Sequence, residues 1–187
     1  MGGYDTLRGN NQKDTAGMAF FKRCITFIDL FTEGCGRLLL WLGFGMAVIT
    51  ALIVVLRYGF GIGSIMLQES VVYMHGGLFL LGAAFALKHG AHVRVDIFYR
   101  DFSERRKAWV NSLGGIVFLL PLCAFILFSS WDYVGDSWAM RESSPEPGGI
   151  PAVFALKTLI PAAAICLALQ GIAEVLRSAV VLVEGDA

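Results

Sequence analysis

Charged residues are scarce in this sequence. Asp, Glu, Lys and Arg make up 16% of its 187 residues and hydrophobic residues 56%, whereas soluble domains carry roughly 25% charged residues. The charges also gather in groups, leaving four long apolar stretches. A hydrocarbon core of about 30 Å needs roughly 20 helical residues to cross it. We therefore predict an all-α membrane protein with four transmembrane helices.

The sequence also has no net charge and no cysteine motif. The formal net charge is +0 and no basic face recurs, so we expect no nucleic-acid partner. Cys24, Cys35, Cys123 and Cys166 show no C-x-x-C spacing, which favours structural thiols. The first long apolar run begins only at Leu38, after a segment of mixed charge, so we expect no secretory signal peptide.

The four predicted spans form one bundle over 35–177. Nearly uncharged stretches place them at about 38–57, 69–88, 108–131 and 150–174, followed by a C-terminal tail at 178–187. Short links favour antiparallel neighbours. Pro121 and Pro161 each remove a helical hydrogen bond, so we expect a kink in the third and fourth spans.

The segment before the bundle has two parts. Residues 1–16 are polar and lack periodicity, which predicts a flexible N-terminus. Over 17–34, phenylalanines and isoleucines gather on one side of a helical projection, and Lys22, Asp29 and Glu33 on the other. This pattern predicts an amphipathic helix that lies flat in the membrane interface, against another subunit, or on its own bundle.

Lys and Arg are distributed unevenly between the two sides of the predicted bundle. Twelve of the fifteen belong to the N-terminal arm, the loop between the second and third spans, and the tail. Short loops rich in Lys and Arg stay in the cytoplasm. We therefore expect both termini in the cytoplasm.

Histidines are too few and too far apart for an obvious haem site. Of the three, His89 and His92 follow the second span, and only His75 lies within a span. His75 and a histidine at the other end are more than about 20 Å apart along the helix. We expect no cofactor in this chain, and we expect His75 to be a hydrogen-bonded interior residue. The alternative is that the chain is a haem- or quinone-associated anchor of a respiratory complex.

The central thirds of the spans contain no Asp, Glu, Lys or Arg. Ion-coupled transport by this chain alone would call for buried carboxylates or broken helices near the bilayer midplane. Any coupling-ion or substrate site is therefore expected on another polypeptide.

The remaining charges lie at helix ends and in loops. Arg57 and Glu69 flank the first link, where they either stabilise their own helix ends, pair with each other or meet a partner. Lys157 is expected to extend to the membrane interface. The acidic loop after the third span is either solvated or a docking surface, through Asp132, Asp136, Glu142 and Glu146. In the middle loop, Arg94 and Asp96 are candidates for fixing the ends of the second and third helices.

Several strings in the chain resemble a known family, the small membrane subunit (DctQ type) of tripartite ATP-independent periplasmic (TRAP) transporters. The strings are Arg57-Tyr58-Gly59-Phe60, Gln68-Glu69, the stretch 86–96 (ALKHGAHVRVD), Gly149-Ile150-Pro151, Lys157, Ile160-Pro161 and Leu169-Gln170. The branch labelled mannitol or chloroaromatic transport is the most similar, judged from 131–133 (WDY) and 144–149 (SPEPGG).

The resemblance implies a three-part secondary transporter in the bacterial inner membrane. A periplasmic solute-binding protein would deliver an organic acid to a large membrane subunit, which is expected to carry the sodium sites and to move as an elevator. This chain would be a fixed scaffold in membrane lipid, bracing the large subunit and helping to receive the binding protein. It is not expected to be an enzyme.

Overall fold

The computed structural model describes residues 3–91, 99 and 101–184. All regular structure in this part of the chain is helical. The helices are α1 (Gly3–Phe60), α2 (Ile65–Lys88), α4 (Glu104–Gly114), a π-helical turn (Gly115–Leu119), α5 (Leu120–Ala139) and α6 (Val153–Glu184). The α-helical class predicted from the sequence is confirmed.

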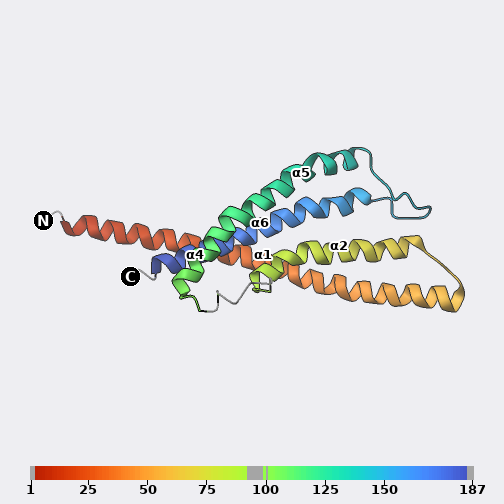
Figure 1. Cartoon of the computed structure of the whole chain (residues 1–187), viewed down its shortest axis with the longest axis horizontal. Coiled ribbons are helices and arrows are strands. Elements are labelled where there is room, and N and C mark those ends of the chain that lie inside the picture. Colours follow the sequence, from red (N-terminus) through yellow and green to blue (C-terminus); the bar gives the residue numbers. More distant parts are fainter. Residues whose placement is uncertain (1–2, 92–98, 100, 185–187) are drawn as a thin grey trace.

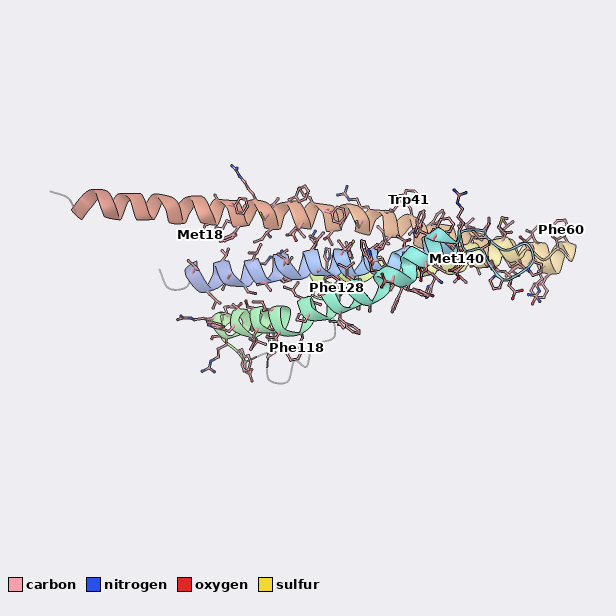
Figure 2. The ribbon with its side chains drawn as sticks, turned by 90° about the horizontal axis from the view of Figure 1, so that it is seen from above. Met18, Trp41, Phe60, Phe118, Phe128 and Met140 are labelled. Carbon is pink, nitrogen blue, oxygen red and sulfur yellow. The ribbon has the colours of Figure 1, made fainter. Side chains whose placement is uncertain are left out.

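Four of the helical stretches are long and apolar enough to cross a membrane. They are Met18–Phe60, Ile65–Lys88, Glu104–Ala139 and Val153–Val183. Each contains most of a predicted span and extends beyond it, so the expected C-terminal tail is largely the end of α6. Large apolar side chains, such as those of Trp41, Phe118 and Phe128, point away from the bundle (Figure 2). That arrangement suits a lipid environment, where the outside of a bundle is apolar.

Helix α1 runs without interruption, which differs from the expected division into a flexible arm, an interfacial helix and a span. Gly34 and Gly36 lie where the boundary was expected, but a single glycine weakens a helix by only about 1 kcal/mol. Proline, which does block a helix, is absent until Pro121. The amphipathic segment 17–34 therefore continues directly into the first span.

The hairpin between α1 and α2 depends on two local signals. Gly61 adopts a left-handed backbone conformation, with φ of 68°, and the Ile62 N–H donates to the Leu56 carbonyl at 2.9 Å. Ser64 then caps α2, because its hydroxyl oxygen accepts the Leu67 N–H at 3.4 Å. The chain reverses in four residues, as the short link predicted.

The third span bends near Pro121. The π-helical turn lies just before this proline, and the Leu120 N–H there donates to the Gly115 carbonyl, five residues back. Figure 2 shows the α4–α5 rod changing direction between Phe118 and Phe128. A π turn beside a proline is a common cause of such a bend. Helix α6, in contrast, continues through Pro161.

Helix α6 lies at the centre of the bundle and packs against α1, α2, α4 and α5. Two glycines permit close approach to the bent third span. A Cβ atom on Gly171 would lie 2.7 Å from Leu119 Cδ2, and one on Gly115 would lie 2.6 Å from Val175 Cγ2. Small residues at such contacts let membrane helices approach one another.

The bundle has two distinct ends (Figure 1). Both termini, the end of α2 and the start of α4 lie at one end, which we call the terminal end. The α1–α2 hairpin and the loop 140–152 between α5 and α6 lie at the other, which we call the hairpin end. Both ends of the chain thus share one side of the bundle.

Candidate functional site

Polar side chains gather in two clusters, one at each end of the bundle. The terminal cluster consists of Asp29, Thr32, Glu33, Lys88, His89, Gln170, Glu174 and Arg177; the hairpin cluster consists of Glu69, Ser137, Glu142, Ser144 and Lys157. Between them the helices carry no Asp, Glu, Lys or Arg, over 38–56, 70–87, 108–131 and 158–173. At about 1.5 Å per residue these stretches are about 24 to 36 Å long, which is comparable with the thickness of a hydrocarbon core.

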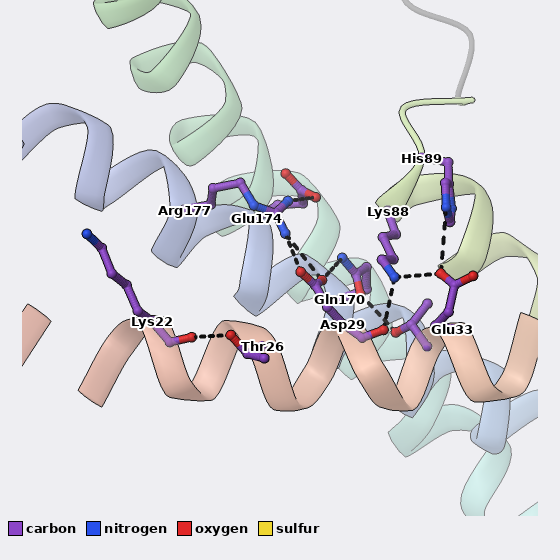
Figure 3. Close-up of polar contacts among 10 residues, drawn as sticks. Lys22, Thr26, Asp29, Glu33, Lys88, His89, Gln170, Glu174 and Arg177 are labelled. Atoms are coloured by element: carbon purple, nitrogen blue, oxygen red, sulfur yellow. Dashed lines mark hydrogen bonds and ion pairs between the residues drawn. The ribbon is translucent and has the colours of Figure 1, made fainter. Parts of the chain in front are cut away.

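Asp29 joins α1 to α6 in the terminal cluster (Figure 3). Arg177 donates to both of its carboxylate oxygens, at 3.2 and 2.9 Å, and the Gln170 amide nitrogen lies 3.3 Å from one of them. The side-chain carbonyl oxygen of Gln170 accepts a hydrogen bond from the Thr32 hydroxyl at 2.9 Å. Arg177 also donates to Glu174, one turn earlier on α6. The carboxylate, which is partly exposed, thus receives charged and neutral donors together.

Glu33 joins α1 to α2 in the same cluster. The Lys88 ammonium donates to its carboxylate at 2.7 Å and to the Asp29 main-chain carbonyl at 3.0 Å. The His89 ring nitrogen Nε2 lies 3.7 Å from the same carboxylate. The polar side of the amphipathic segment therefore faces α2 and α6, and this segment packs on its own bundle, one of the three placements expected.

Glu69 anchors the outer loop in the hairpin cluster. Its carboxylate accepts the Ser144 hydroxyl through one oxygen and the Ile150 main-chain N–H, at 2.6 Å, through the other. The loop closes on itself, because the Ser144 N–H donates to the Ile150 carbonyl at 3.2 Å. Glu69 neither pairs with Arg57 nor lies in the first turn of α2. Its role here is to hold residues 144–150 in place.

Glu142 anchors the start of that loop. Lys157 donates to its carboxylate at 2.6 Å, and so does the hydroxyl of buried Ser137, also at 2.6 Å. The hydrogen bond from Lys157, followed by that from Ser137, lowers the pKa of the Glu142 carboxyl below its ordinary value of 4.5. The Lys157 ammonium also lies 4.0 Å from the centre of the Tyr133 ring, a cation–π contact.

The candidate residues separate into anchored and free groups. Glu69, Glu142 and Lys157 make contacts within the chain, whereas four others have exposed side chains: Arg57, Asp132, Asp136 and Glu146. Arg94 and Asp96 lie outside the described residues. The acidic stretch expected to be one loop is divided in the structure: Asp132 and Asp136 lie in the last turns of α5, and only Glu142 and Glu146 lie in the loop 140–152. Three of the four acids are therefore exposed near the hairpin end, two on α5 and one on the loop.

The terminal cluster was largely missed by sequence reasoning. Asp29 and Glu33 were recognised as the polar side of a helix, but the partner of that side was not. One signal was available: Gln170 is the only Asn or Gln in α6, and a single amide in an apolar span needs a hydrogen-bond partner. The sequence spacing does not reveal that Thr32 and Asp29 supply it.

Metal and haem ligation find little support among the histidines. No group of three or more His, Cys, Asp or Glu side chains that could hold a metal ion occurs within 3–91, 99 and 101–184. His75, expected as an interior residue, is instead exposed and stacks on Phe79, with 6.3 Å between ring centroids. His75 lies near the middle of α2 and His89 directly follows the helix, so the two are about 21 Å apart along it at 1.5 Å per residue. His92 lies outside the described residues.

Comparison with known proteins identifies one family. Residues 46–180 match the family described as "Tripartite ATP-independent periplasmic transporters, DctQ component". A relative from Vibrio cholerae serotype O1, the "C4-dicarboxylate TRAP transporter small permease protein DctQ", is 27% identical over 126 residues, which cover 64% of this chain and 54% of the relative. The chain thus spans about half the length of that curated relative. No solved structure matches.

Proposed function

The chain belongs to the DctQ component family of tripartite ATP-independent periplasmic transporters, and we propose that it is a scaffold that braces the large membrane subunit of a sodium-coupled organic-acid transporter. The observation that carries this proposal is the uncharged middle of the bundle between two polar clusters. Handling an ion or an acid at membrane depth needs polar ligands there. The sodium and solute sites are accordingly assigned to the large subunit.

A brace must keep its helices in place while a neighbouring domain moves. The terminal cluster ties α1 to α2 and α6 through Asp29 and Glu33, and the hairpin cluster ties α2 and α6 to the outer loop through Glu69 and Glu142. Contacts at both ends resist sliding and tilting of the helices. This arrangement supports a stationary role better than a moving one.

The hairpin end is proposed to receive the periplasmic binding protein. Asp132 and Asp136 are exposed on the last turns of α5, and Glu146 is exposed on the outer loop, which Glu69 and Glu142 hold in place. Complementary charges increase the rate of encounter and are screened by salt. Replacing the three exposed acids with lysine should weaken docking at low salt, with Glu104→Lys at the terminal end as the matched control. Unchanged affinity would remove the docking role.

The proposed location is the bacterial inner membrane, with the terminal end in the cytoplasm. This orientation rests on the bias of Lys and Arg toward the N-terminal arm, the middle loop and the tail. The branch labelled mannitol or chloroaromatic transport stays a prediction, as does the organic acid. The haem- or quinone-anchor alternative is not favoured, since the chain belongs to a transporter family.

Co-purification with the large subunit tests the assignment. When the two chains are expressed together, an affinity tag on this one should bring down the large subunit at a fixed ratio after detergent extraction. A tagged chain that never retains the large subunit, in several detergents and in lipid nanodiscs, would contradict the proposal. A Soret band in the purified chain would instead support the haem alternative.

A further inference from the structure

Helix α1 has an apolar face with no partner in the described part of the chain. Phe20, Phe27 and Phe31 are 63%, 74% and 47% exposed. At 100° per residue their directions agree to within about 40°. We call these three residues the outer face of α1. Similar phenylalanines on a helix within the bilayer would simply meet lipid.

The opposite side of the same segment is already occupied. Asp29 points away from the outer face and binds Arg177 of α6, while Glu33 binds Lys88 of α2 (Figure 3). A helix lying flat in the headgroup layer directs its polar side to water and its apolar side into lipid. This segment directs its polar side to the bundle, so it continues in the direction of the first span.

The length of α1 places the outer face beyond the bilayer. The apolar stretch Met18–Phe60 has 43 residues and measures about 64 Å, roughly twice a hydrocarbon core. If Arg37 and Arg57 bracket that core, Phe27 lies about 15 Å and Phe20 about 25 Å outside it. The headgroup layer adds only about 5 to 8 Å on each side.

Tilting does not remove this distance. A helix tilt of about 20°, the usual value, shortens heights along the membrane normal by only about 6%. Lipid therefore cannot cover Phe20 and Phe27 while the polar clusters keep their contacts. A large aromatic surface in water favours a protein partner.

The charges beside the outer face indicate the chemistry of that partner. Arg23 and Arg37 are both exposed and border the outer face on one side at 100° per residue. An apolar helix with carboxylates along one edge would match both the aromatic and the cationic parts. We propose that the outer face of α1 is the docking surface for such a helix of the large membrane subunit, at the terminal end; this inference rests on the proposed function.

The test compares two positions on the same helix in the co-expressed complex. The pair Phe20→Asp and Phe27→Asp should reduce the large subunit recovered with this chain at least tenfold. Phe60→Asp, at the hairpin end of α1 and 70% exposed, should leave recovery unchanged. Unchanged recovery with the Phe20/Phe27 variant would overturn the inference while the proposed function stands. Failure of the wild-type chain to retain the large subunit would count against the proposed function itself.

A second measurement avoids charged substitutions. A photoreactive benzoylphenylalanine replaces Phe27 in one sample and Phe60 in another, and each complex, otherwise unchanged, is illuminated in membranes. The expected product is a covalent adduct with the large subunit from position 27 and not from position 60. Adducts at position 27 with lipid alone, or with a second copy of this chain, would overturn the inference.

Discussion

Replacing Gln170 with leucine should weaken the contact between α1 and α6. The Gln170 side chain is 0% exposed and Thr32 is 3% exposed, and the hydrogen bond between them measures 2.9 Å. Leucine has a similar volume but leaves the Thr32 hydroxyl without its acceptor. An unsatisfied buried group costs about 1 to 3 kcal/mol, and side-chain hydrogen bonds in membrane proteins average about 0.6 kcal/mol.

We expect a loss of about 1 to 2 kcal/mol for this variant. In chains of this size each kcal/mol shifts the unfolding midpoint by about 2 to 4 °C, so Gln170→Leu should unfold about 2 to 8 °C below the wild type. The assay is thermal unfolding in detergent, followed by the reactivity of the four native thiols. The second bond of Gln170, at 3.3 Å to Asp29, is long and adds less.

The double variant provides the control. Thr32→Val alone leaves the Gln170 carbonyl oxygen without its donor, and Thr32→Val with Gln170→Leu replaces both partners by apolar groups, which is close to neutral for a buried pair. The double variant should therefore lose less stability than the two single losses combined, by about 1 kcal/mol. Strict additivity would refute the view that this hydrogen bond joins α1 to α6.

Three further predictions concern other contacts. Cys35 and Cys166 lie one turn beyond that hydrogen bond on the facing helices, and with the other cysteines replaced by serine they should form an intramolecular disulfide with copper phenanthroline. After cleavage of the chain between them, two separate fragments on a non-reducing gel would contradict this packing. The pKa of Glu142 is lowered in the folded chain, so its stabilisation of the outer loop is complete above the ordinary value of 4.5 and lost as the pH falls through the folded value. The protection of 140–152 against hydrogen exchange, relative to the intrinsic rate at each pH, should therefore fall there in the wild type. Glu142→Gln should show low protection at every pH. Gly171→Leu should overpack the contact with Leu119 and destabilise by about 1 to 3 kcal/mol, while Gly135→Leu, in open space, should not.

The four spans could be predicted because their signal is local. A run of uncharged residues of sufficient length requires no knowledge of its neighbours, and 38–57 and 69–88 both lie within helices of the structure. The helix ends were less predictable. The change of pattern at residue 34 predicted a boundary there, but α1 continues through it, and its polar side finds partners such as Lys88 and Arg177.

The polar clusters depend on contacts between residues far apart in the chain. Glu69 and Ile150 are 81 positions apart, and Asp29 and Arg177 are 148 apart. The sequence indicated that these residues lie at helix ends, which is correct. It did not indicate that Glu69 and Glu142 point inward while Asp132 and Asp136 stay exposed, because that choice depends on the path of the outer loop and on which side of α5 packs against α6.

Uptake measured in proteoliposomes tests the central claim most directly. Liposomes containing the large subunit together with this chain, supplied with the binding protein, a candidate organic acid and a sodium gradient, should take up the acid, and those lacking this chain should not. Liposomes containing this chain alone should show no uptake, because its membrane-embedded middle has no charged ligands. Sodium-dependent uptake by the isolated chain would contradict the account.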